Sequence, residues 1–134
     1  MGAVRGGLCA YASGHGIHLA ANSVSNVSPG PTAHLWDEVV GHYIWYAGVA
    51  LVLAAIADTM TSRPRPPWWA YVLSVGVGLT WATNALGGGT EVLGVIIALG
   101  AVLLGWRRRA SLAAVLWVGF APAVGILVVA SFAG

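Results

Sequence analysis

Four stretches of the chain are apolar over a length that suits a membrane-spanning helix. They run from about residues 38 to 58, 68 to 86, 91 to 106 and 111 to 132. Crossing the hydrocarbon core of a bilayer takes about 20 predominantly apolar residues in a helix. The third of these stretches is short, so we expect it to stand nearly upright or to include flanking residues. The pattern predicts an all-α fold, an integral membrane helical bundle.

The N-terminal stretch, from about residue 3 to 22, is less apolar than the other four. It contains His15, His18 and several glycines. A cleaved signal peptide has an uninterrupted apolar centre, and here Gly14, His15 and Gly16 interrupt it. We therefore predict a fifth transmembrane helix; the alternative is a four-helix bundle in which this segment does not span. Because almost no tail precedes this helix, we also expect that the start is truncated.

Turn-forming residues separate the predicted helices. Residues 25–31 are typical of a polar loop, residues 62–67 contain three prolines, and residues 87–89 are all glycine. Thr90 is placed to cap the helix that starts at Glu91. No internal repeat or second domain is evident, so residues 1–134 are expected to form a single transmembrane helical domain. Glycines inside the helices suit close helix contacts in lipid; they are residues 76, 78, 94, 100, 105, 119 and 125.

The composition agrees with lipid as the main solvent of this chain. Of its 134 residues, 58% are hydrophobic and only 7% are charged. A soluble domain devotes about a quarter of its residues to charge. So few charged residues cannot cover a water-soluble globule of this size, which disfavours the alternative of a very apolar soluble bundle. Membrane lipid is therefore the expected partner.

Several function classes are excluded by what the sequence lacks. The chain has no lysine, which removes Schiff-base chemistry and a Walker-type phosphate-binding loop. Its single cysteine, Cys9, rules out an internal disulfide and a CxxC redox pair. The net charge of +2 is too small to indicate nucleic-acid binding. A homo-oligomer or a partner membrane subunit is not excluded by any of these features.

The arginines predict an orientation. Positive residues in short loops stay on the cytoplasmic side. In a five-helix bundle, Arg5, the pair Arg63 and Arg65, and the run 107–109 all fall on one side of the membrane. We therefore expect a multi-pass cell-membrane protein with a cytoplasmic N-terminus and an extracytoplasmic C-terminus. A four-helix topology leaves Arg5 unexplained.

The remaining polar residues gather on the opposite side. In the five-helix topology, all four histidines and three of the four acids lie in the outer half of the bundle or in its outer loops, and only Asp58 lies apart. Residues three or four apart share one face of a helix, so Tyr11, His15, His18 and Asn22 form a polar stripe on the first helix. Glu38 and His42 form a second stripe at the same spacing. Ionisable residues at membrane depth usually face the bundle interior and mark function.

A divalent metal site is the chemistry that fits these stripes best. Zinc takes neutral imidazole and carboxylate ligands. His15, His18 and His42 are the candidate metal ligands, and Glu38 or Asp37 is the candidate catalytic base or an orienting partner. The spacing HxxH followed by DExxxH is not a named zinc signature.

Each of these residues also has an ordinary structural interpretation. A histidine near the interface often only bonds to the backbone or to a carboxylate, above all His34, which is expected in a loop. Asp37 and Glu91 are placed as first-turn acids of their helices. Thr83 and Asn84 are more simply explained by hydrogen bonds between helices.

Two segments carry a resemblance. Residues 14–22, with the pattern GHGxHLAAN, and residues 37–43, with the pattern DExxGHY, resemble signature blocks of an uncharacterised family of small bacterial multi-pass membrane proteins. More remotely, a histidine and acid cluster at one face of a helical bundle is similar to the alkaline ceramidase-like membrane hydrolases. That likeness implies zinc bound by histidines and hydrolysis of amide bonds in lipids. The chain departs from it in having fewer predicted helices and no histidine pair late in the sequence.

Four classes of function therefore follow from the sequence. The first is a metal-dependent membrane hydrolase that acts on a lipid-like substrate at the extracytoplasmic face. The second is a haem b protein for electron transfer, with histidines of the first two helices as axial ligands. The third is a transport subunit, which the almost purely apolar inner halves of the helices disfavour. The fourth is a structural subunit without catalysis, so enzymatic activity is not decided by the sequence.

Overall fold

The computed structural model describes residues 2–133, and within this range the chain is helical and contains no strand. The helix α1 runs over Gly2–Val27. The short helix α2 (Pro31–His34), the π-helical segment η1 (Leu35–Gly41) and α3 (His42–Thr61) follow one another without interruption. The remaining helices are α4 (Trp68–Gly87), α5 (Glu91–Arg107) and α6 (Ala114–Ala133). The all-α prediction is confirmed.

The helix ends agree with the sequence prediction in the second half of the chain and differ in the first half. The loop expected at residues 25–31 is present but shorter, at residues 28–30, because α1 continues to Val27 and the next helix begins at Pro31. Proline is well suited to the first position of a helix, because it has no N–H to leave unpaired. Thr90 stands at the N-cap of α5, but its side chain makes no capping hydrogen bond.

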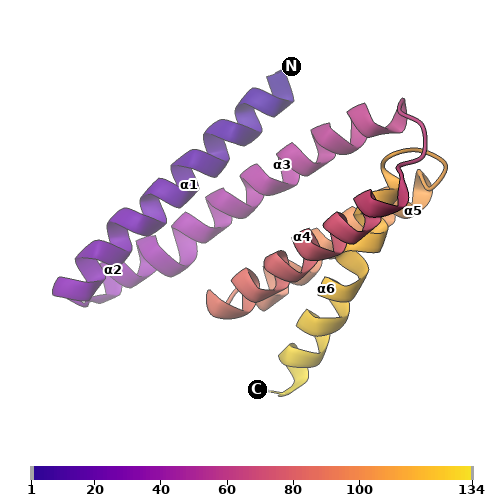
Figure 1. Cartoon of the computed structure of the whole chain (residues 1–134). Helices are drawn as coiled ribbons and strands as arrows, with labels where there is room; N and C mark the ends of the chain where they lie inside the picture. Colours follow the sequence, from indigo (N-terminus) through magenta and orange to yellow (C-terminus); the bar gives the residue numbers. More distant parts are fainter. Residues whose placement is uncertain (1, 134) are drawn as a thin grey trace. The chain divides into compact units, whose positions relative to one another are not determined.

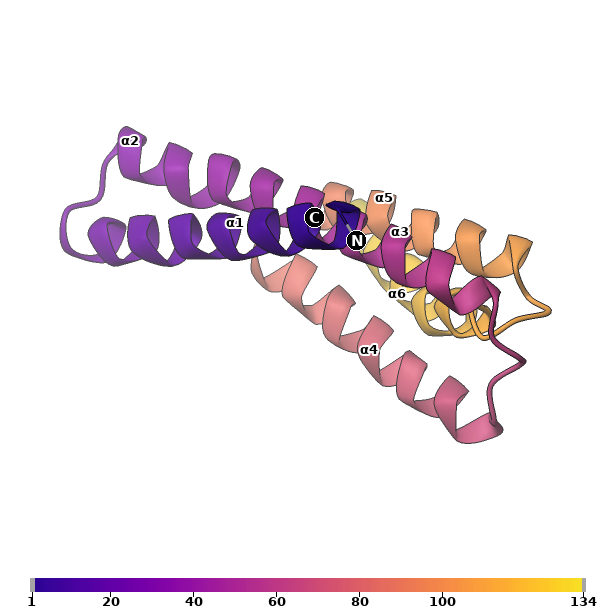
Figure 2. The ribbon, with the colours of Figure 1, turned by 90° about the horizontal axis from the view of Figure 1, so that it is seen from above.

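The chain divides into two compact units, and the boundary between Ala55 and Ile56 lies inside α3. In the first unit, α1 and the continuous helix that begins at Pro31 lie side by side and antiparallel (Figures 1 and 2). The turn between them contains Pro29 and Gly30. The first unit is therefore a helical hairpin.

Glycines hold the two helices of the hairpin close together. Gly7 and Gly14 on one helix, and Gly41 and Gly48 on the other, are each seven residues apart and buried. A spacing of seven residues is almost two turns, so each pair lies on one helix face. A Cβ atom built on Gly14 would overlap the backbone of Trp45, and one built on Gly48 would overlap the backbone of Tyr11. Because these glycines have no side chain, the backbones of the two helices can come into contact. Small residues commonly have this role where helices pack in lipid.

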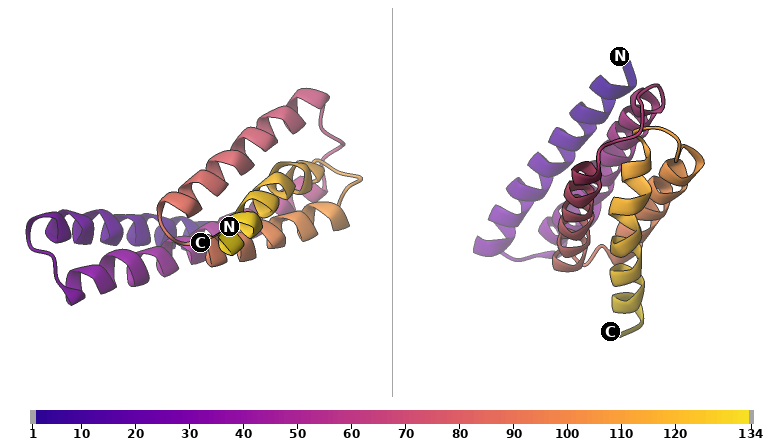
Figure 3. Two further views of the ribbon diagram at one scale, coloured as in Figure 1. Left: turned by 90° about the horizontal axis from the view of Figure 1, so that it is seen from below. Right: turned by 45° about the vertical axis from the view of Figure 1, so that its right-hand side comes forward.

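The second unit consists of the end of α3, from Ile56, and of α4, α5 and α6, with α6 packed beside both α4 and α5 (Figure 3). Its core consists mainly of alanines, with Val115, Leu116, Phe120 and Leu127 as the larger buried side chains. Gly78 on α4 and Gly119 on α6 again lie backbone to backbone. The indole Nε1 of Trp81 donates a hydrogen bond of 3.0 Å to the carbonyl oxygen of Gly94, which ties α4 to α5.

Two helices of the described chain are long and apolar enough to cross a membrane, judged by length and composition. They are the continuous helix Pro31–Thr61, of 31 residues, and α6, of 20 residues. Large apolar side chains are exposed on the helices of both units, for example Leu8, Val72, Ile96 and Val129. These surfaces are suited to contact with lipid chains.

Candidate functional site

The candidate site lies in the first unit, where η1 packs against α1. Gly41, the last residue of η1, faces the backbone of His18: a Cβ atom there would lie 3.0 Å from the His18 nitrogen. The missing side chain lets the two backbones meet at this level. Asp37 and His42, which flank this contact on the second helix, are thereby brought beside the imidazole of His18. Short π-helical segments are frequent at functional sites because they change the direction of the side chains they carry.

His18, which is partly exposed, and the buried Asp37 form a polar pair. The Nδ1 atom of His18 lies 2.6 Å from Oδ1 of Asp37, and the Asp37 side chain is only 6% exposed. Neither atom has another hydrogen-bond partner among the described residues, and the pair itself lies at ion-pair distance without the alignment of a good hydrogen bond. The carboxylate therefore depends on this one imidazole for compensation of its burial.

His42 is held on its own helix. Its Nδ1 atom lies 3.0 Å from the backbone carbonyl oxygen of Glu38 and 3.8 Å from Oε2 of the same residue. The side chain of His42 is 4% exposed, whereas that of Glu38 is 40% exposed. The imidazole is thus fixed by its Nδ1 atom, and the Glu38 carboxylate remains accessible.

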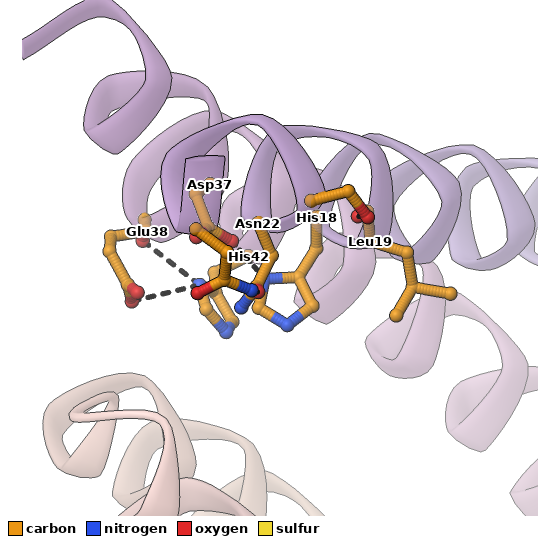
Figure 4. A network of polar contacts seen from close by, with 8 residues as sticks. His18, Leu19, Asn22, Asp37, Glu38 and His42 are labelled. Atoms are coloured by element: carbon orange, nitrogen blue, oxygen red, sulfur yellow. Dashed lines mark hydrogen bonds and ion pairs between the residues drawn. The ribbon is translucent and has the colours of Figure 1, made fainter. Parts of the chain in front are cut away.

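The two imidazoles lie in contact, with ring centroids 4.6 Å apart and an interplanar angle of 51°. In both rings the Nδ1 atom faces an acceptor, which leaves Nε2 for another partner. Figure 4 shows the second ring nitrogen of each histidine pointing to the same side, away from the carboxylates of Asp37 and Glu38. The site therefore presents two imidazole nitrogens together.

Aromatic rings surround this pair. Trp45 lies against the rings of His42, His15 and Tyr11, with centroid distances of 6.1, 5.8 and 6.1 Å. The indole Nε1 of Trp45 is buried and has no hydrogen-bond partner among residues 2–133. Tyr46, which is also buried, lies beside His42 at 6.5 Å. The histidine pair is therefore bordered by aromatic rings, and the indole N–H of Trp45 lies beside it.

The predicted site residues are brought together in part. His18, His42, Asp37 and Glu38 form one cluster. The His15 ring is exposed, stacks on Tyr11, and has its centroid 6.5 Å from that of His18, at the edge of the cluster. Within the described residues, no group of three or more histidine, cysteine or acidic side chains is arranged to hold a metal ion.

Other candidates lie outside this cluster. His34 is in the helix α2 rather than in a loop, and it is exposed. Asp37 is in the first turn of η1, inside the continuous helix that begins at Pro31, and it is buried against His18. Trp45 continues the stripe of Glu38 and His42, as its position three residues after His42 predicts, and its ring lies beside those of His42 and His15.

No protein-family model, curated protein or solved structure matched this chain.

Proposed function

We propose that the chain is a multi-pass integral membrane protein of five spanning helices. We also propose that a divalent metal ion, most simply zinc, binds at the extracytoplasmic end of its first hairpin. The two apolar helices of membrane-spanning length and the exposed apolar side chains of both units support the membrane placement. The helix α5 has 17 residues and is about 25 Å long at 1.5 Å per residue, slightly less than the hydrocarbon core, so it would stand nearly upright. The positions of the arginines support a cytoplasmic N-terminus.

The observation that carries the metal proposal is the state of the four imidazole nitrogens of His18 and His42. Histidines that bind metal usually donate their other ring N–H to a carboxylate or a backbone carbonyl, which fixes the ring and its tautomer. The Nδ1 atom of His18 lies at ion-pair distance from the Asp37 carboxylate, and that of His42 lies at hydrogen-bond distance from the Glu38 carbonyl oxygen, so each ring has a partner of this kind beside it. The two Nε2 atoms are the proposed ligands, and His15 at the edge of the cluster is the proposed third.

The proposed reaction is hydrolysis of a lipid-like substrate. A bound zinc ion supplies a water that is acidic enough to react near neutral pH. Within this proposal Asp37 is an orienting residue, because it is buried and committed to His18. Glu38 is the proposed general base, because its carboxylate is accessible and lies beside His42. The indole N–H of Trp45, which is buried and has no partner among the described residues, is the proposed hydrogen-bond donor to a polar group of the substrate.

The ring contact of the two histidines favours this proposal over haem. Two axial imidazoles of one haem lie on opposite faces of the porphyrin. Here the imidazoles of His18 and His42 contact each other directly, so no porphyrin plane fits between them in this arrangement.

Elemental analysis and an absorption spectrum of the detergent-purified protein test the proposal. We expect about one zinc per chain, which the double substitution His18→Ala/His42→Ala removes. His34→Ala is the matched control, because His34 is an exposed histidine outside the cluster, and zinc should be retained. Absence of bound metal in the unmutated protein, or equal loss in the control, would overturn the metal site, and a Soret band would assign the histidines to haem. Metal-dependent cleavage of a fluorescent lipid amide then tests the reaction.

A further inference from the structure

A second site candidate lies in the other unit, where two arginine-rich loops meet. The backbone N–H of Leu112 donates a hydrogen bond of 3.2 Å to the carbonyl oxygen of Arg63, which ties the loop after α5 to the loop after α3. A hollow of about 440 Å³ lies at this junction. It is lined by Arg63, Arg107 and Arg108 and by the hydroxyl-bearing residues Thr61, Ser62 and Ser111.

Among the side chains that line this hollow, the guanidinium groups are the hydrogen-bond donors that remain available for a ligand. The hydroxyl groups of Thr61, Ser62 and Ser111 already donate to backbone carbonyl oxygens, at 2.7, 3.0 and 2.8 Å. In the described part of the chain both ion pairs are formed by histidines, so Arg63, Arg107 and Arg108 have no carboxylate partner there. Three uncompensated positive charges around one hollow favour an anionic ligand.

The neighbouring arginines are engaged differently. The guanidinium carbon of Arg109 lies over the ring of Trp106, 5.0 Å from its centroid. Arg65 and Arg109 line a separate hollow with the aromatic residues Tyr71 and Trp117. The loop after α3 therefore contributes Arg63 to the anionic-ligand candidate, and the end of α5 with its following loop contributes Arg107 and Arg108. Each loop also places one arginine, Arg65 or Arg109, in an aromatic environment outside it.

We propose that the hollow at Arg63, Arg107 and Arg108 binds a phosphate group, and that an anionic phospholipid of the cytoplasmic leaflet supplies it. Arginine recognises phosphate through paired hydrogen bonds, and basic pockets at cytoplasmic helix ends bind anionic headgroups. Trp68 and Trp106, at the helix ends next to these loops, are 77% and 51% exposed, as suits residues at the membrane interface. The lipid source rests on the proposed membrane placement, whereas the phosphate chemistry and the zinc site are independent of each other.

Native mass spectrometry of the full chain in detergent tests this inference. The probes are phosphatidylglycerol, phosphatidylcholine with the same acyl chains, and inorganic phosphate. We expect retention of phosphatidylglycerol over phosphatidylcholine. Arg63→Gln/Arg108→Gln should weaken phosphatidylglycerol binding by about tenfold or more, since hydrogen bonds to charged groups are the strong ones.

Arg65→Gln/Arg109→Gln is the matched control, because it removes the same charge from the same two loops outside the hollow. This variant should retain the preference for phosphatidylglycerol. Arg63→Lys/Arg108→Lys keeps the charge and the fold and loses the paired hydrogen bonds, so it should bind the anionic lipid more weakly than the unmutated protein. Equal weakening in both glutamine pairs, or no preference between the two lipids, would overturn the site. Displacement of the lipid by an equal concentration of inorganic phosphate would overturn the lipid assignment and leave a free-phosphate site.

Discussion

The pairing of His18 with Asp37 indicates that the Asp37 carboxylate orients the His18 imidazole. A buried acid in an apolar bundle is costly unless a partner compensates its charge, and Asp37 has that single partner. Glu38, its neighbour in sequence, is half-exposed and faces the other histidine at a longer distance. Two adjacent acids therefore occupy different environments and should differ in what their loss costs.

The substitution Asp37→Asn should weaken zinc binding without removing a ligand. The amide keeps the size of the side chain but loses the negative charge that orients His18, and loss of such orienting partners costs about 10- to 100-fold in metal affinity. Competition with a zinc chelator measures the dissociation constant. Glu38→Gln is the control for the removal of one acid; it should lower the rate of hydrolysis and leave zinc affinity within a few-fold. Equal zinc affinity in the two variants would show that Asp37 does not orient a ligand.

At the scale of the elements, glycine positions decide how closely the helices pack. Among the glycines that the sequence indicated for helix contacts, residues 78, 94, 105 and 119 do meet a neighbouring helix, whereas residues 76, 100 and 125 face open space. The four glycines of the first hairpin were not singled out, although their seven-residue spacing was visible in the sequence. Spacing alone does not tell which helix will lie opposite, so the partner face could not be predicted.

The substitution Gly14→Ala should open the hairpin. Its added methyl group would overlap the backbone of Trp45, and forced overlap in a packed contact costs about 1 to 3 kcal/mol. Gly16→Ala is the matched control on the same helix, because a methyl group there meets nothing within 4 Å; it should be neutral or slightly stabilising, since alanine is the better helix former. Thermal unfolding in detergent, followed by circular dichroism, compares the two. Equal unfolding temperatures would contradict the close packing of α1 on α3.

Helix ends were predictable where turn chemistry is strong and less so elsewhere. The prolines of residues 62–67 and the glycines of residues 87–89 placed the starts of α4 and α5 at Trp68 and Glu91. Residues 25–31 were assigned to a polar loop, and His34 was also expected in a loop. Pro31 begins a helix instead of ending one. The π-helical segment was not predicted, because the 3.6-residue spacing by which the stripes were recognised assumes regular α-helix.

At the scale of the whole molecule, composition predicted an apolar helical protein and could not fix the chemistry of its site. The spacing of His18, Asp37 and His42 indicated shared faces within each helix, which is local information. Contact between the two faces depends on the rotation of each helix about its axis, which Gly41 sets by admitting the backbone of His18. The residue types of the cluster were therefore predictable, but the pairing of His18 with Asp37 was not.

The proposed orientation predicts which loops react with a membrane-impermeant maleimide in intact cells. In a Cys9→Ser background, Gly88→Cys should be labelled, because the turn between α4 and α5 lies outside in this topology. Ser62→Cys should be labelled only after the membrane is permeabilised, because the arginine-rich loops stay in the cytoplasm. Ser28→Cys, in the turn of the first hairpin, should behave like Gly88→Cys. Labelling of Ser62→Cys and not of Gly88→Cys in intact cells would reverse the orientation.

The π-helical segment η1 also determines how the protein responds to the deletion of a residue between residues 35 and 41. A π-helical turn holds more residues than an α-helical turn, so η1 follows the same path with an additional residue. Deleting one residue there, for example Val40, would restore α-helical turns and leave the preceding segment at nearly the same angle relative to His42, because the wider turn is what accommodates the additional residue. Asp37 would then still face His18. A single-residue deletion should therefore be tolerated better between residues 35 and 41 than in the regular α-helical turns of α3, where it would rotate the two sides of the helix by about 100° relative to each other.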